Sequence, residues 1–133
     1  MTNTKALKLI QNCLETQATT LDLSNLGLTE LPKELANCTQ LTKLYLGNNQ
    51  LTDIILLAGL TQLRWLDLGN NQLTDITPLA NLTQLTWLYL NDNNITDITA
   101  LANLTQLTSL NLCNNQLTNV DCLSKLTNCT IVK

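Results

Sequence analysis

The sequence repeats itself every 22 residues, and this spacing constrains the fold more than any other feature. Four copies begin at Leu41, Leu63, Leu85 and Leu107, and each copy carries further leucines at its fourth and sixth positions. An earlier copy, one residue longer, begins near Ala18, and a partial sixth copy begins at Cys129. We therefore divide the chain into an N-terminal segment 1–17, five repeats over 18–128 and a truncated repeat strand over 129–133.

Two spacings within each copy predict local structure. The leucines at the fourth and sixth positions alternate with polar or variable residues, which indicates a short strand with one buried face. Later leucines recur every third residue, which is typical of a tight 3-10 return segment. The pair Thr77-Pro78 is suited to begin such a segment, and we expect Thr77 to cap it, with Pro78 placed where its missing N–H costs nothing.

A single copy cannot bury its own leucines, so the copies must stack. Stacking aligns the strands into one parallel sheet along one face of a solenoid. Strands are wider than the compact return segments, so the sheet is expected on the concave side. The predicted fold class is α/β: a curved solenoid with a concave parallel sheet, short 3-10 or irregular convex segments and an N-terminal capping helix.

The ninth position of each copy is an asparagine, and we expect these side chains to form a structural ladder. The chain turns inward there, and its backbone groups lose their strand partners. A buried amide supplies both a donor and an acceptor to the neighbouring turns. The ladder residues are Asn49, Asn71, Asn93 and Asn115, and the first copy carries Leu26 instead.

The pattern LxxLxLxxNxL, present four times, resembles the leucine-rich repeat family. Copies such as LTDITPLANLTQL at 73–85 resemble the 22-residue subclass of bacterial internalins and of a regulatory subunit of protein phosphatase 1. The first copy, LDLSNLGLTELPKEL, resembles the opening repeat of bacterial, notably cyanobacterial, leucine-rich repeat proteins, including those fused to Roc GTPase domains. The resemblance implies a right-handed horseshoe and a protein-binding concave face. Neither the secretion signal and dedicated cap of internalins nor a GTPase sequence is recognised here.

The two ends of the chain carry different expectations. Residues 4–17 have the apolar periodicity of an amphipathic helix, which we expect to cover the first repeat. A membrane-surface or partner-binding helix is the alternative, although its polar face has few cations for anionic lipid. The C-terminus shows no evident cap: the chain is cut from a longer protein, its open edge pairs with another molecule, or the residues after Leu126 suffice.

The outward strand positions hold the candidate partner-binding residues. All four aromatic residues of the chain fall there, in copies two to four. Rigid aromatic side chains on a solvated face favour a binding patch, whereas simple cross-strand packing is the alternative. Nearby carboxylates indicate a protein or peptide partner of apolar and basic character. The candidate set is Lys43, Tyr45, Trp65, Asp67, Trp87, Tyr89 and Asp92.

Composition argues against several other functions. The chain has no histidine, only 7 lysines and arginines, and a net charge of -3. We therefore expect no catalytic residues, no metal, no cofactor and no nucleic-acid partner, and the short apolar runs predict no membrane span. Calcium binding on the aspartate-bearing face is a weak alternative, since such a site needs several convergent oxygens. Five cysteines with no CxxC fit a reducing compartment, and Cys13, Cys38 and Cys129 are expected to be buried.

These observations predict a non-enzymatic protein–protein interaction module, bacterial and cytoplasmic, that binds a protein or peptide on its concave face. Two alternatives stay open. One is a structural repeat unit that dimerises through its open C-terminal edge or its concave face. The other is the sensor segment of a larger signalling protein.

Overall fold

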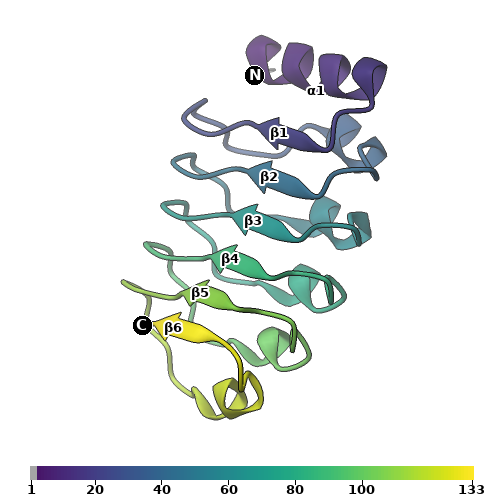
Figure 1. The fold of residues 1–133 in the computed structure, drawn as a ribbon. Helices are drawn as coiled ribbons and strands as arrows, with labels where there is room; N and C mark the ends of the chain where they lie inside the picture. The colour runs from purple at the N-terminus through teal and green to yellow at the C-terminus, as the bar shows by residue number, and fades with distance from the viewer. Residues whose placement is uncertain (1–2) are drawn as a thin grey trace.

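The protein is a single curved stack of short coils, each contributing one strand to a parallel sheet (Figure 1). The computed structural model describes residues 3–133. Six strands lie in chain order across the sheet, and their bounds are β1 Thr20–Asp22, β2 Lys43–Tyr45, β3 Trp65–Asp67, β4 Trp87–Tyr89, β5 Ser109–Asn111 and β6 Thr130–Val132. The expected α/β leucine-rich repeat solenoid is confirmed.

The register of the sheet places equivalent repeat positions side by side. Leu44 pairs with Leu66, which pairs with Leu88. At the N-terminal edge, the longer first copy still aligns, because Leu21 pairs with Leu44. Outward residues therefore align with outward residues over the whole sheet, and the sequence columns are true neighbours in space.

The core is a continuous column of aliphatic side chains between the sheet and the convex segments. Repeat leucines such as Leu44, Leu66 and Leu88 are completely inaccessible to solvent. Each coil buries its leucines only against the coils before and after it, so the core is as long as the stack. The side chains on the outer face of the sheet therefore do not contribute to the leucine core.

The return segments on the convex side are short 3-10 helices, as the three-residue leucine spacing predicts. They are η1 Lys33–Asn37, η2 Ile55–Gly59, η3 Thr77–Leu79, η4 Thr99–Leu101 and η5 Asp121–Lys125.

The prediction that Thr77 caps its segment is wrong. Ile76 holds the cap position, and Thr77 is the first helical residue. The capping oxygen comes instead from the side chain of Asp75, whose Oδ1 accepts from the Thr77 N–H at 2.9 Å. An aspartate side chain can accept from the backbone N–H two residues further along the chain. Thr77 is itself the first helical residue, so its own side chain does not cap its N–H. Asp53 and Asp97 make the same bond in their repeats.

The asparagine ladder ties neighbouring coils together. In Asn71, Oδ1 accepts from the Leu51 N–H at 3.0 Å, while Nδ2 donates to the carbonyls of Leu46 and Leu68. Asn49, Asn71 and Asn93 are buried, and Asn115 is partly buried near the C-terminal end. Each amide thus satisfies backbone groups of two successive coils at once.

Helix α1, Thr4–Thr16, packs across the N-terminal end of the stack (Figure 1). The Asn3 side chain caps it by accepting from the Ala6 N–H. Its apolar face contributes Ala6, Ile10 and Cys13 to the core, so α1 covers leucines that the first coil would otherwise expose.

The C-terminal end of the stack is less well covered. Strand β6 pairs with β5 on one side only, and Val132 is 50% exposed. The five cysteines are all free. Cys13 and Cys38 are buried as expected, whereas the expectation for Cys129 is wrong: it is only partly buried, because no further coil packs over it among residues 3–133.

Candidate functional site

The concave face presents the side chains that point away from the leucine core. Strand residues alternate between the two faces of a sheet, so Leu66 is buried while Trp65 and Asp67 on either side of it face outward. Registered pairing then builds two outward columns. One column contains Lys43, Trp65 and Trp87, and the other contains Tyr45, Asp67 and Tyr89.

Three of the four aromatic rings form one contiguous stack. The ring centroids of Trp65 and Trp87 are 3.9 Å apart, and those of Trp87 and Tyr89 are 4.2 Å apart. The planes of each pair are tilted by about 30°. All three side chains are partly buried rather than enclosed. We call Tyr45, Trp65, Trp87 and Tyr89 together the aromatic patch; it lies on β2, β3 and β4, at the middle of the sheet.

Lys43 extends the stack at its N-terminal side. Its Nζ lies over the Trp65 ring at 5.3 Å from the centroid, which is cation–π geometry. The Trp65 indole is less well satisfied: Nε1 is buried and has no hydrogen-bond partner among the described residues. An unpaired buried N–H costs about 1–3 kcal/mol, so the stack is not optimised for stability alone.

Asp67 is a partly buried carboxylate between two tyrosines. Its Oδ1 accepts from the Gly69 N–H at 2.9 Å, and its Oδ2 lies over Gly47, where an added Cβ would be 3.1 Å away. Burial raises the pKa of Asp67, the Gly69 N–H opposes this, and the Asp22 carboxylate adds to the rise. The small residue at Gly47 is thus what allows the carboxylate to lie close to the sheet.

The structure does not place Asp92 on the strand with the other candidates. It follows β4 in a turn, with a left-handed φ of 57°. Its two carboxylate oxygens accept from the side-chain amides of Asn91 and Asn114, at 2.7 and 2.8 Å. Asp92 is therefore already engaged along the rim of the concave face.

Sequence reasoning located the columns but missed three features of this site. They are the unpaired Trp65 Nε1, the closeness of Asp67 to Gly47, and the closeness of Asn91 to Gly69. The glycines at 47 and 69, beside polar residues one repeat later, are a signal that could have indicated the last two.

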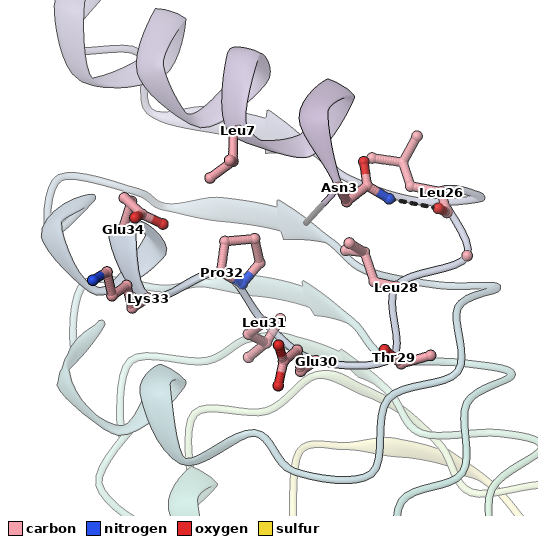
Figure 2. Close-up of a pocket in the computed structure, with 11 residues that line it drawn as sticks. Asn3, Leu7, Leu26, Leu28, Thr29, Glu30, Leu31, Pro32, Lys33 and Glu34 are labelled. Carbon is pink, nitrogen blue, oxygen red and sulfur yellow. Dashed lines mark hydrogen bonds between the residues drawn. The ribbon is translucent and has the colours of Figure 1, made fainter. Parts of the chain in front are cut away.

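A second concavity lies at the N-terminal end of the molecule, beside α1 (Figure 2). It is a hollow of about 700 Å³ between α1 and the loop that follows β1. Leu7, Leu31 and Pro32 contribute to its walls, and the Asn3 Nδ2 donates to the Leu26 carbonyl at 2.8 Å beside it. Of the charged residues that line it, Glu30 and Lys33 are solvent-exposed and Glu34 alone is partly buried, so the described residues do not form the convergent polar groups of a ligand site.

Other kinds of site are not indicated by the described residues. Within residues 3–133, no three histidine, cysteine, aspartate or glutamate side chains gather in a way that could hold a metal ion. In the same range, no helix has the length and apolar character needed to cross a membrane.

A stack of registered 22-residue coils, with an asparagine ladder inside and a bare concave sheet outside, defines the class of parallel-sheet solenoid repeat proteins. Family comparison specifies the class further. The family described as "Leucine rich repeat" matches residues 16–73, and "Leucine Rich repeats (2 copies)" matches residues 61–103 and 83–128. The chain therefore belongs to the leucine-rich repeat family.

Solved structures place the chain close to the internalins. Internalin C2 of Listeria monocytogenes is 47% identical, with a TM-score of 0.83 over 86% of this chain and 50% of that one. Internalin F of the same species is 33% identical, with a TM-score of 0.65 over 77% of this chain and 37% of that one. A leucine-rich repeat protein of Leptospira interrogans is 26% identical, with a TM-score of 0.80 over 92% and 33%.

The similarity extends beyond bacteria over a short segment. A leucine-rich repeat protein of Nematostella vectensis, a soc-2 homologue, is 52% identical over 44 residues, which is 33% of this chain and 8% of that protein. The chain thus spans half or less of the length of these relatives. The repeat type is internalin-like, and an internalin-like repeat array supports a protein-interaction module in general terms.

Proposed function

We propose that this chain binds a protein or peptide on its concave face, without catalysis, and that the aromatic patch is the centre of the contact. The observation that carries the proposal is the stack of Trp65, Trp87 and Tyr89 at the middle of the sheet. Interface energy is concentrated in a few central aromatic side chains, which lose little conformational entropy when they are covered.

The alternative account of the stack is cross-strand packing for stability. Two observations favour binding over this account. The leucine core on the other face is complete without the rings. The stack also leaves the buried Trp65 Nε1 without a partner, which a purely stabilising cluster would be expected to avoid.

Capture experiments with paired variants test the proposal. The immobilised wild-type chain is compared with a Trp65→Ala/Trp87→Ala double variant, and Ile55→Ala serves as the matched control because Ile55 is 60% exposed on η2 of the convex side. We expect Ile55→Ala to retain the captured proteins. Each tryptophan change should cost about 2 kcal/mol or more, roughly 30-fold in affinity for a captured partner.

Circular dichroism and a thermal melt of each variant verify that it is folded. Unchanged capture by a folded double variant would refute the concave-face proposal. Capture lost equally in Ile55→Ala would refute it as well, because the contact would then not be specific to the concave side.

Self-association is a second candidate, supported by strand β6. Its outer edge has no strand partner among the described residues, and Val132 is half exposed beside it. An unpaired strand edge is a template for pairing with a second chain. Sedimentation velocity across a dilution series tests this candidate: a monomer at every concentration contradicts it, and a concentration-dependent dimer that a Val132→Lys change abolishes supports it.

We further propose a bacterial origin and a reducing, cytoplasmic location. The bacterial relatives support the first, and the five free cysteines, two of them buried, support the second. Thiol labelling of the protein in lysates of its native host, with and without prior reduction, tests the location. Cysteines that can be labelled only after reduction are paired as disulfides in the host and would contradict it.

A further inference from the structure

The concave face contains a notch at Asp67, and the notch has the chemistry of a cation site. In the registered column, Asp67 lies between Tyr45 on β2 and Tyr89 on β4. The two tyrosines are two strand spacings apart, roughly 10 Å, and the aspartate between them is much shorter. The register therefore places a tyrosine on each neighbouring strand beside the partly buried Asp67, and the ring of Tyr89 also packs against Trp87 with the centroids 4.2 Å apart.

Among residues 3–133, no basic side chain pairs with the Asp67 carboxylate. Its Oδ1 has the Gly69 N–H as a donor, whereas Oδ2 accepts no hydrogen bond among the described residues. No basic side chain is among the groups that shift its pKa, which are burial, the Gly69 N–H and the Asp22 carboxylate. Lys43, on the neighbouring strand, lies instead over the Trp65 ring. The notch thus keeps an acceptor available to an external donor.

We propose that this notch binds the guanidinium group of an arginine side chain of the partner, with Asp67 as the ion-pair acceptor and Tyr45 and Tyr89 as the flanking walls. This inference rests on the proposed function and names the chemistry of the partner. A planar guanidinium donates to a carboxylate while its faces contact aromatic rings, which an ammonium cannot do equally well. A metal cation fits less well, because a single carboxylate provides too few oxygens.

The test uses small probes that differ by one property. Nα-acetyl-arginine amide is compared with Nα-acetyl-citrulline amide, which has the same shape without the charge, and with Nα-acetyl-lysine amide, which has the charge without the planar fork. Binding is followed by 15N NMR through the Gly69 amide, which donates to Asp67, and through the indole resonances of the chain's 2 tryptophans. We expect arginine to bind at least tenfold more tightly than citrulline or lysine.

Matched aspartate variants connect the binding to Asp67. Asp67→Asn retains an oxygen that can accept from Gly69, so the fold is preserved while the charge is lost. Asp92→Asn removes the same charge from a carboxylate that is already held by Asn91 and Asn114. We expect Asp67→Asn to weaken arginine binding at least tenfold and Asp92→Asn to leave it unchanged.

Several outcomes would overturn the assignment. Equal binding of arginine and citrulline would exclude the ion pair, and equal binding of arginine and lysine would exclude guanidinium recognition. Full arginine binding by Asp67→Asn would exclude this residue. The concave-face proposal is tested separately, by protein capture with the wild type and the Trp65/Trp87 double variant. Failure of the arginine notch can therefore be told apart from failure of the concave-face proposal.

Discussion

Replacing Asn71 with leucine tests the idea that the buried amides, and not the leucines alone, hold successive coils in register. Leucine has a similar size and suits the apolar interior, so the change mainly removes hydrogen bonds. The short bonds removed are those from the Leu51 N–H to Oδ1 and from Nδ2 to the carbonyls of Leu46 and Leu68. A longer bond of 3.4 Å from Nδ2 to the Gly69 carbonyl is lost as well, and that carbonyl keeps the Asn48 N–H as a donor.

The cost can be worked out bond by bond. The Leu46 carbonyl retains a bond from Asn49, and the Leu68 carbonyl retains one from Asn93. Only the Leu51 N–H is left with no acceptor, at about 1–3 kcal/mol, and the two lost carbonyl bonds add roughly 1 kcal/mol each. We therefore expect Asn71→Leu to lower the free energy of unfolding by about 4 kcal/mol, within the stability of roughly 7–20 kcal/mol that a chain of 133 residues commands.

Urea unfolding followed by circular dichroism measures this loss, and Asn115→Leu provides the comparison. Asn115 makes equivalent bonds but is only partly buried, so water can replace part of what the amide supplied. The cost at Asn115 should therefore be smaller than at Asn71. The reasoning would be refuted by a loss below about 1 kcal/mol at Asn71, or by an equal or greater loss at Asn115.

Two further predictions concern aspartates. Hydrogen bonds from Thr77 and Thr99 lower the pKa of Asp75 and Asp97, so their contribution to stability is present above the ordinary value of 3.8 and is lost as the pH falls below it. An Asp75→Asn/Asp97→Asn variant should keep the capping bonds, because Asn119 makes the same bond to the Asp121 N–H. In thermal melts between pH 5 and about 2, the variant should lose less stability than the wild type as the pH falls. An identical loss of stability would contradict this prediction. Burial raises the pKa of Asp67, so folding is less favourable once this group ionises above its ordinary 3.8. Asp67→Asn should therefore raise the free energy of unfolding at pH 7, by less than about 1 kcal/mol because the group is partly exposed. A thermal melt should show a slightly higher melting point, and a melting point below that of the wild type would count against the description of the notch.

The fold could be predicted from the sequence because every copy carries leucines that only its neighbouring copies can bury. Leucines such as Leu44, Leu66 and Leu88 can be buried only by stacking, and stacking allows only one register. The capping of the return segments was harder to foresee. Asp75 looks like an ordinary surface residue in the sequence, and its bond to the Thr77 N–H depends on a turn geometry that the leucine spacing does not reveal.

The candidate site was predictable in position but not in detail. Strand alternation places Trp65 and Trp87 on the concave face whatever their rotamers are. The distance between their rings, the buried Trp65 Nε1 and the position of the Asp67 carboxylate over Gly47 depend on side-chain torsions, which periodicity does not determine. Burial of Cys129 was overestimated because a repeat pattern carries no information on whether another coil follows.

Equal registration of every coil makes length a modular property of this molecule. Excising residues 61–82 would remove β3 together with its return segment and join two chain ends that already occupy corresponding places one coil apart. The remaining coils would close up without any change in their internal contacts. Tyr45 would then become the direct neighbour of Tyr89, so a shortened protein would keep its architecture while losing the partly buried carboxylate of Asp67.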